Sequence, residues 1–365
     1  MLFRSSGNLA FGQAISDVTL GSNLFQAGKR NEIKAWIVSV NNGSDLNNQN
    51  DSTIKNLYAS FCGTYTVGGV SPDINNFTEL SNALNIAGVL CPVVFKVRPG
   101  VYNEQVKFIS IPGASEINSI KFQSDGGDSL NTRIEYSLFN PSNDFTLLLD
   151  GTNYMTFEKI GIKRIGGSKN IRLKGTAGNL SFNNCLLGKI RNENVYLQNL
   201  LFEKNNMLDS VVLFNSTQGQ NLIFNSNKFS KLIYLKNWNN PKLLNNIAIF
   251  AGAKEIIRIE NSFKSEINGN KITVQPTSEY NQDIYAMIID QCDSAKIINN
   301  TMSAQGDCSF NIPAFLSVLR SNALYLANNT VTLTYNYNGC GTRPSAVSLY
   351  NVNNAFLENN NMIVM

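Results

Sequence analysis

The sequence predicts an all-β fold, a right-handed parallel β-helix solenoid with a short capping helix near its N-terminal end. Three observations predict it. Apolar-x-apolar segments followed by asparagine recur from about Ser119 onward. Only 15% of residues are charged, and Asn, Ser, Thr and Gly supply the polarity, which favours turns over helix. Helical spacing of apolar residues is convincing once, just before Gly88.

Composition excludes several classes of function. The chain has 365 residues, 43% of them hydrophobic, which is enough to bury a large core. A net charge of +4 with no basic run is too small for a nucleic-acid footprint. The absence of histidine excludes Ser-His-Asp, Cys-His and His-zinc mechanisms. No stretch approaches the roughly 20 apolar residues of a membrane span, so we expect no membrane insertion.

The pattern of apolar and turn-forming residues in 1–60 predicts a partial β-sandwich segment. Apolar residues in EIKAWIVSV (Glu32 to Val40) indicate a strand, and Ile54 to Phe61 indicate another. Between them, Asn41 to Ser52 form a polar loop rich in turn-forming residues. This is too short for a sandwich domain of about 100 residues, and it resembles the second half of one. We therefore place a domain boundary between residues 1–60 and 61–365.

A short helix is predicted next, at the start of the solenoid. Asn76 is an N-cap with Glu79 three residues on, as in a capping box. Phe77, Leu80, Leu84 and Ala87 follow helical spacing on one face, and Gly88 ends the helix. Such a helix would cover the open apolar end of a stack of coils.

The repeat itself is irregular in length. Measured between the first asparagine-equivalent positions, steps run from 16 to 31 residues, the shortest lying between Asn183 and Asn199. The members are SIKFQS, MTFEKIGI, LSFNNCL, VYLQNLLF, LIFNSNKF, KLLNNIAI, EINGNKI, KIINNTM, LYLANNTV and FLENNNM.

Stacked coils explain the asparagines. Equivalent residues of a parallel β-helix lie above one another at the strand spacing of about 4.8 Å. Asparagine tolerates the left-handed conformation of a sharp corner, and its amide can bond to the asparagines above and below. We therefore predict a structural ladder formed by Asn184, Asn246, Asn300, Asn329 and Asn360, with an asparagine-lined ligand groove as the alternative.

Six cysteines are spread along the chain without a CxxC pair, which disfavours a zinc ribbon or a redox motif. In an exported protein, Cys62 with Cys91, and two of Cys292, Cys308 and Cys340, could form disulfides. The alternative is that they are buried small apolar residues.

A family resemblance supports this fold. The runs GTYTVGGVSPDINNFTELSNAL, PVVFKVRPGVYNEQV and IPGASEINSIKFQS resemble the start of β-helix modules in large secreted surface proteins of Bacteroidota. Those modules are pectin-lyase-like right-handed β-helices, often adhesins exported by the type IX route. Upstream, SGNLAFGQAISDVTLGSNLFQAG, IKAW and NDS resemble the end of an Ig-like, CARDB-type module. The resemblance implies a secreted or cell-surface location and a larger parent polypeptide, of which this chain is a fragment.

Enzymes also use this scaffold. Pectate lyases hold calcium with acidic residues and use an Arg or Lys base. The candidate residues for these roles in this sequence are Asp290, Asp293, Lys296 and Arg320. Ordinary solvated turn residues are the alternative for this loose match. PGVYNEQV also resembles the start of pectin methylesterases, but no matching Gln-Asp, second Asp and Arg set follows. No cofactor is expected, although calcium is compatible with the acidic residues.

Aromatic side chains are candidates for stacking on sugar rings. Trp238 in NWNNP, together with Tyr335, Tyr337 and Tyr350, forms this set, with strand packing as the alternative. The first functional hypothesis is a non-catalytic adhesin or spacer, glycan-binding through polysaccharide or surface glycan contacts. The second is a polysaccharide-lyase-like enzyme, and the third is a receptor-binding trimer resembling a tailspike.

Overall fold

A computed structural model describes most of the solenoid and parts of the N-terminal region. The described residues are 6–8, 10, 13, 14, 17, 19, 21–25, 30–39, 49, 52–137, 144–164, 170–193, 195–251, 255–275, 285–306, 314–335 and 345–365. No helix among them is long and apolar enough to cross a membrane.

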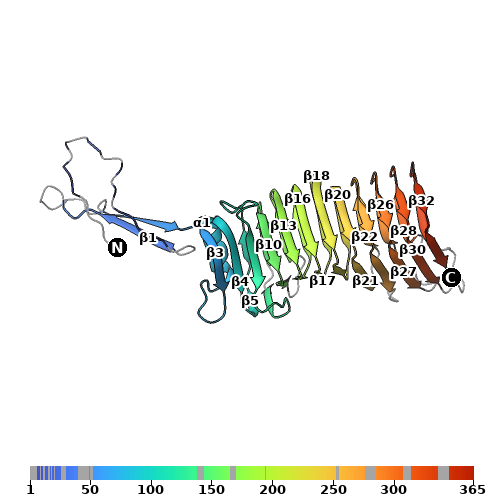
Figure 1. Ribbon diagram of the computed structural model, residues 1–365, viewed down its shortest axis with the longest axis horizontal. Coiled ribbons are helices and arrows are strands. Elements are labelled where there is room, and N and C mark those ends of the chain that lie inside the picture. Colours follow the sequence, from blue (N-terminus) through green and yellow to red (C-terminus); the bar gives the residue numbers. More distant parts are fainter. Residues whose placement is uncertain are drawn as a thin grey trace.

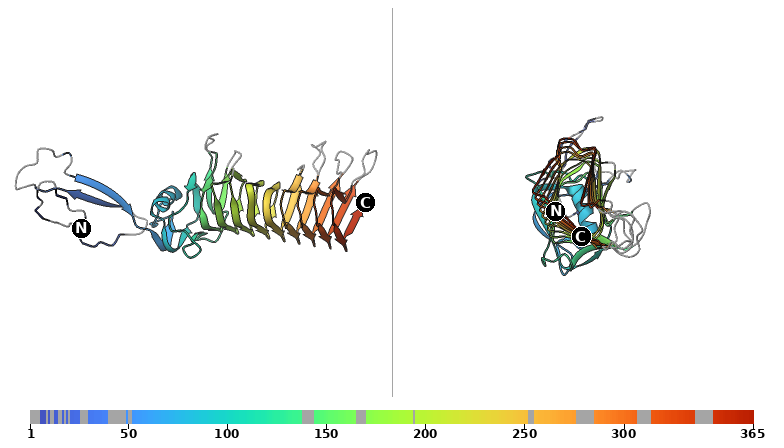
Figure 2. Two further views of the ribbon diagram at one scale, coloured as in Figure 1. Left: turned by 90° about the horizontal axis from the view of Figure 1, so that it is seen from above. Right: turned by 90° about the vertical axis from the view of Figure 1, so that its right-hand side faces the viewer.

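The chain winds into a right-handed parallel β-helix, as predicted, whose coils stack along one axis (Figures 1 and 2). Each coil contributes to three faces, A, B and C. Faces A and C are joined into one 20-stranded sheet because β18 and β20 each bend across the corner between them, and face B is an 11-stranded sheet. The pairing within both sheets is parallel throughout.

The strands of each face are as follows. Face A contains β3 (Phe61–Val67), β4 (Val89–Val97), β7 (Ile120–Ser124), β10 (Asn153–Glu158), β13 (Ala177–Asn183), β16 (Leu197–Glu203), the later parts of β18 (Val211–Asn225) and β20 (Ile233–Leu244), β23 (Glu266–Asn268), β26 (Lys296–Ile298), β29 (Tyr325–Ala327) and β32 (Phe356–Glu358). Face B contains β5 (Gly100–Asn103), β8 (Thr132–Tyr136), β11 (Gly161–Arg164), β14 (Leu186–Leu187), β17 (Asn206–Met207), β19 (Lys228–Phe229), β21 (Ile247–Ala251), β24 (Lys271–Gln275), β27 (Thr301–Gly306), β30 (Thr330–Tyr335) and β33 (Asn361–Val364). Face C contains β6 (Val106–Phe108), β9 (Leu147–Asp150), β12 (Ile171–Lys174), β15 (Ile190–Glu193), the earlier parts of β18 and β20, β22 (Glu255–Glu260), β25 (Tyr285–Asp290), β28 (Leu316–Leu319) and β31 (Val347–Tyr350).

The N-terminal region is built differently. β1 (Arg30–Trp36) and β2 (Ser52–Tyr58) form a separate antiparallel pair, with Ile33 opposite Lys55. Pairing changes to parallel at β3. This change lies at the predicted boundary between residues 1–60 and 61–365, and the assignment of the first part to a partial Ig-like segment stays a prediction.

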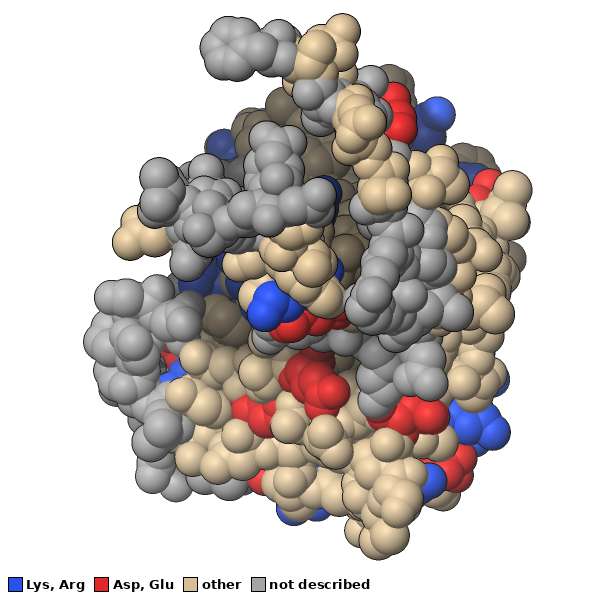
Figure 3. Space-filling view, turned by 90° about the vertical axis from the view of Figure 1, so that its left-hand side faces the viewer, with Lys and Arg blue, Asp and Glu red and all other residues tan. Residues whose placement is uncertain are grey.

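The predicted capping helix is confirmed as α1 (Phe77–Ala87). Asn76 Oδ1 accepts the Glu79 amide at 2.8 Å, and Gly88, at φ 66°, donates to Leu84 O at 2.9 Å. Glu79 reaches back to the amide of Asn75 rather than to that of Asn76. Phe77, Leu80 and Leu84 are buried, so the helix covers the first coils. Acidic side chains gather at this end of the molecule (Figure 3), where Glu104 accepts the amides of Phe77 and Thr78.

Aromatic rings fill the N-terminal half of the core beneath face A. Six phenylalanines in successive coils stack with ring centroids 4.7–5.3 Å apart and planes within 20° of parallel. The register of face A continues the column with Leu243, Ile267 and Ile297. Period-two alternation places these side chains inward, as expected for a strand with one buried face. The six rings are Phe95, Phe122, Phe157, Phe182, Phe202 and Phe224.

An asparagine ladder runs inside the corner between faces A and B. Each side-chain amide donates to a backbone carbonyl, and each except that of the last residue, Asn360, also donates to the Oδ1 of the next coil at 2.9–3.1 Å. That Oδ1 also accepts the backbone N–H of the ladder residue before it. The column is Asn205, Asn227, Asn246, Asn270, Asn300, Asn329 and Asn360.

The prediction was wrong for Asn184. Its side chain is exposed and its φ is 53°, whereas the next residue, the buried Cys185, occupies the ladder position and donates its amide to Asn205 Oδ1. This corner contains two separate columns of residues. One column is formed by the left-handed corner residue of each coil, and the other, which is the ladder, by the inward-pointing residue directly after it. Asn199 is also not the corner residue of its coil, because Lys204, at φ 54°, holds that place. The corrected steps along the ladder, starting from Cys185, are 20, 22, 19, 24, 30, 29 and 31 residues.

One predicted disulfide is confirmed. Cys62 and Cys91 are bonded and join β3 to β4. Cys185 and Cys292 are buried free thiols, and burial is the main reason that the pKa of each is raised to about 12. Cys292 therefore takes no part in a disulfide, and Cys308 and Cys340 lie outside the described residues.

Candidate functional site

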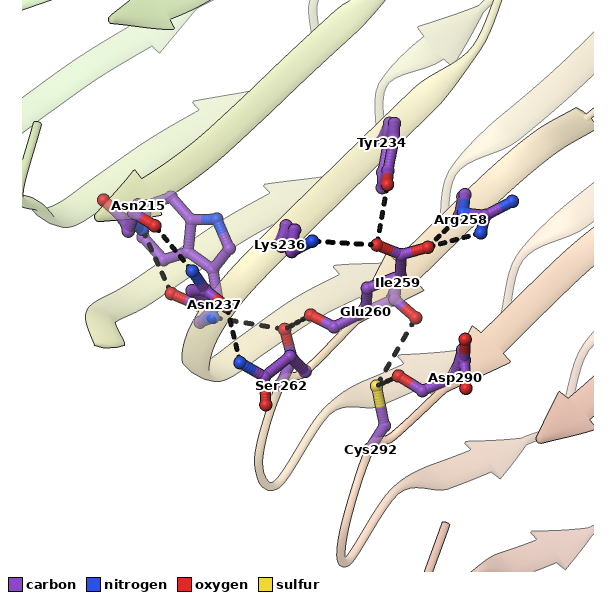
Figure 4. A network of polar contacts seen from close by, with 12 residues as sticks. Asn215, Tyr234, Lys236, Asn237, Arg258, Ile259, Glu260, Ser262, Asp290 and Cys292 are labelled. Carbon is purple, nitrogen blue, oxygen red and sulfur yellow. Dashed lines mark hydrogen bonds and ion pairs between the residues drawn. The ribbon is translucent and has the colours of Figure 1, made fainter. Parts of the chain in front are cut away.

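Face C carries a polar cluster on its outer surface (Figure 4). The outward residues of β20 and β22 converge on Glu260. Tyr234 donates its hydroxyl to Oε2 at 2.7 Å, Arg258 Nε donates to Oε1 at 2.6 Å, and Lys236 Nζ lies 3.5 Å from Oε2. Parallel register produces this arrangement, since Tyr234 aligns with Arg258 and Lys236 aligns with Glu260 in the next coil.

Two shifted pKa values follow from this cluster. Burial alone would raise the pKa of Glu260, but hydrogen bonds from Tyr234 and Arg258, with the charges of Arg258 and Lys236, bring it below its ordinary value of 4.5. Burial, followed by the hydrogen bond to Glu260, raises the pKa of Tyr234 to about 12. At neutral pH, Glu260 is therefore an ionised carboxylate whose oxygens are already engaged, which makes it an anchor and a poor proton donor.

A hollow opens next to this cluster. It has a volume of about 390 Å³. Phe214, 36% exposed, meets the Tyr234 ring edge-on at 4.4 Å, which connects the hollow to the Glu260 cluster. Asn192 fixes the Phe214 backbone by accepting its amide at 2.8 Å and donating to its carbonyl at 2.6 Å. The lining residues are Asn192, Glu193, Phe214, Asn215 and Ser216.

An irregularity in β18 forms one wall of the hollow. The register between β18 and β20 shifts between Phe214 and Gly219, so extra residues project at the corner between faces C and A. Asn215 is buried there and accepts the Leu197 amide at 2.8 Å. Gln218 reaches Asn261 O, two coils on, at 3.0 Å. Side chains and backbone thus hold the projecting segment in place, and the hollow is preformed.

Trp238 does not belong to any exposed binding surface, and that prediction was wrong. Its side chain is 0% exposed, and its indole N–H donates to Leu213 O at 3.1 Å. Gly219, which has no side chain, is its neighbour in the previous coil. A large ring with its single donor satisfied fills the corner of the core.

Of the three predicted tyrosines, the structure describes the side chain of one, Tyr350. Tyr350 is 62% exposed at the end of β31 on face C. Its register runs through Leu319, Asp290, Glu260 and Lys236 to Phe214. Tyr350 and Phe214 thus lie in one outward column. The side chain of Tyr335 and the whole of Tyr337 lie outside the described residues.

The lyase candidates are brought together only in part. Arg320 Nε donates to Asp290 Oδ1 at 2.9 Å, and its Nη2 bonds Oδ2. This pairing raises the pKa of Arg320, which opposes a role as a base. Asp293 Oδ1 accepts the amide of Asn322 at 2.9 Å, and Lys296 begins β26 on face A.

No metal-holding group was found in the part of the chain that the structure describes: it contains no cluster of three or more Asp, Glu or Cys side chains suited to a metal ion. Calcium therefore stays a prediction without a located site. Sequence patterns had not indicated the hollow, because a register shift in one strand creates it and a single phenylalanine looks the same in every strand.

Comparison with known proteins finds distant similarity to solved structures. No family model matches the chain, and no curated protein matches it. Among solved structures, the chain is similar to the GH136 lacto-N-biosidase from Eubacterium ramulus, with 11% identity over 83% of this chain and 68% of that chain, at a TM-score of 0.47. It is similar to the alginate lyase from Paenibacillus sp., with 12% identity over 80% and 99% at a TM-score of 0.41. It is also similar to PfbA, a surface adhesin of Streptococcus pneumoniae, with 11% identity over 82% and 90% at 0.39. These are parallel β-helix proteins of the pectin-lyase-like kind, and they include both enzymes and an adhesin.

Proposed function

We propose that this chain is a secreted or cell-surface β-helix module, an adhesin or spacer, that binds a glycan on face C without chemical turnover. The observation that carries the proposal is the preformed hollow beside Phe214. It combines an exposed aromatic ring with the amide of Asn192, the carboxylate of Glu193 and the hydroxyl of Ser216. A sugar presents apolar C–H groups on one face and hydroxyls at its edge, so it matches such a mixed lining.

The neighbouring surface suits a polymer longer than one sugar. Phe214 and Tyr350 share one outward column of face C, with polar residues between them. A solenoid face of this kind is an extended binding surface. The ligand in this proposal is a polysaccharide or a surface glycan that lies along the coils.

Export is supported by the Cys62–Cys91 bond, because such bonds persist mainly outside the reducing cytosol. We further propose, from the sequence resemblance, that residues 1–60 are a partial Ig-like, CARDB-type segment of a larger secreted Bacteroidota polypeptide that uses the type IX route. The antiparallel pair β1–β2 before the parallel solenoid is compatible with that division.

The absence of turnover is argued from the state of the carboxylates on face C. Glu260 and Asp290, both outward on this face, are each held by an arginine. A lyase-like reaction at Asp290 would need a free base, and Arg320 is committed to that carboxylate. Binding without reaction therefore fits the face better than the polysaccharide-lyase alternative does.

The test is retention on a panel of immobilised polysaccharides, with soluble product scored in the same incubations and calcium either present or chelated. We expect at least one polysaccharide to retain the chain with no product released. Phe214→Ala should weaken that retention roughly tenfold, since it removes the ring beside the hollow. Phe356→Ala is the matched control, because Phe356 is exposed on face A and stacks on Tyr325.

Three results would count against the proposal. Product release would make the chain an enzyme. Retention that responds to Phe356→Ala and not to Phe214→Ala would move the site to face A. Retention by none of the polysaccharides would leave a structural spacer.

A further inference from the structure

Outward residues of face C near the hollow form a column rich in positive charge. Arg172 and Arg191 are direct partners in β12 and β15, and the column continues through Val212 and Tyr234 to Arg258. None of these five residues is acidic. Coils lie about 4.8 Å apart, so the backbones of Arg172 and Arg191 are adjacent and like charges share one strip of surface.

The other arginines whose side chains the structure describes have partners. Five of them pair with a carboxylate, and Arg98 donates to the Val70 carbonyl. Arg191 differs, because no carboxylate, carbonyl or ring partner is found for it in the described part of the structure. Its Nε is buried without a hydrogen bond, as are the Nε atoms of Arg164 and Arg172, but those two arginines each pair with a carboxylate. The paired arginines are Arg133 with Glu135, Arg164 with Asp144, Arg172 with Glu193, Arg258 with Glu260 and Arg320 with Asp290.

The charged residues near Arg191 in the sequence do not neutralise it. The closest acidic residue in sequence, Glu193, is bound to Arg172 in the previous coil. Lys189 lies two residues before Arg191, and burial, then the charge of Arg191, lowers the pKa of Lys189. A guanidinium stays protonated at any ordinary pH, so this strip keeps an uncompensated positive charge.

Position links this charge to the hollow. Asn192 and Glu193, the next two residues of the chain, line the hollow, and Arg191 and Glu193 are alternate residues of the same strand. Their side chains therefore project from the same face of the sheet. A ligand in the hollow would lie next to a partly buried fork of N–H donors that has no acceptor within the described protein.

We propose that Arg191 is the anion-binding subsite of this hollow, so that the glycan bound on face C carries a carboxylate or sulfate group close to the sugar that contacts Phe214. This inference rests on the proposed glycan-binding function and narrows its ligand to acidic glycans. Guanidinium groups bind both anions through two parallel hydrogen bonds, so the two sources share one chemistry.

The experiment uses the full chain and matched pairs of polymers. Dextran sulfate is compared with dextran, and a polyuronate is compared with its carboxyl-reduced form. Affinities are measured by biolayer interferometry at several salt concentrations for the wild type, Arg191→Gln, Arg191→Lys, Phe214→Ala and Lys228→Gln. Lys228 is an exposed cation on face B, so its substitution matches the change in charge at a different place. Melting temperature is recorded for each protein with and without the polymers.

We expect the charged member of at least one pair to bind roughly tenfold or more tightly than its neutral partner. Arg191→Gln should remove that preference and Arg191→Lys should restore only part of it, because lysine lacks the planar fork. Lys228→Gln should keep the preference. The bound polymer should raise the melting temperature of the wild type and not that of Arg191→Gln, while Arg191→Gln alone should not lower it.

The polymer pair that shows the preference for its charged member identifies the bound group as sulfate or carboxylate. Equal binding of the charged and neutral members, with Phe214 still required, would overturn the role of Arg191 and leave the glycan site standing. Equal losses of affinity for the charged polymer in Arg191→Gln and Lys228→Gln would indicate general charge attraction, and this result would also overturn the role of Arg191. Binding of no polymer by any protein would overturn the proposed glycan-binding function itself.

Discussion

At the scale of single residues, ionised groups on face C act as structural anchors. The carboxylate of Glu260 accepts hydrogen bonds from Tyr234 and Arg258 and lies near Lys236, so three side chains from two coils meet at one group. These bonds outweigh the cost of burial and lower its pKa. Because the folded pKa is below the ordinary value of 4.5, Glu260 stabilises the fold above that pH. That contribution disappears as pH falls through the folded pKa.

Glu260→Gln should therefore flatten the acid dependence of stability. We expect the wild-type melting temperature to fall as pH is lowered from 4.5, and we expect a smaller fall in the variant, whose amide does not titrate. Differential scanning calorimetry across this range measures both. Glu116→Gln, at an exposed turn, should keep the wild-type slope. Identical slopes in all three proteins would mean that Glu260 is not held as an ion.

At the scale of elements, corner columns hold consecutive coils in register. Inside the corner between faces A and B, each ladder asparagine satisfies two backbone groups as well as its neighbours. Asn246→Ala leaves the Asn227 amide and the Phe224 carbonyl without their side-chain partners. We expect a loss of about 2–3 kcal/mol in the free energy of unfolding, measured by urea denaturation. Thr332→Ala, outward on face B, should cost far less, and equal losses would contradict a structural ladder.

Sequence patterns predicted these elements unevenly, for physical reasons. α1 was predicted to the residue because capping, spacing and the final glycine are local signals. The ladder was displaced at Asn184 because a left-handed corner residue and the inward residue after it can both be asparagine. Trp238, in a polar run, looked exposed, yet burial depends on which residue of the adjacent coil lies beside it, here Gly219. Arg191 carried no sequence signal, because its lack of a partner depends on contacts across coils.

At the scale of the whole molecule, the solenoid is a support with different chemistry on each face. Face A covers the phenylalanine stack, the adjoining corner contains the asparagine ladder, and face C presents the hollow and the charged column. Cap, disulfide and ladder fix the scaffold without using the outward residues of face C. Binding there should therefore leave the fold unchanged.

Amide hydrogen exchange of the full chain, with and without the polysaccharide that retains it best, tests this account most directly. We predict added protection in β15, in the first half of β18 and in residues 215–218, where the hollow lies, and little change on face B. Phe214→Ala should abolish that protection. Protection confined to face B or to α1, with face C unchanged, would contradict a glycan site on face C.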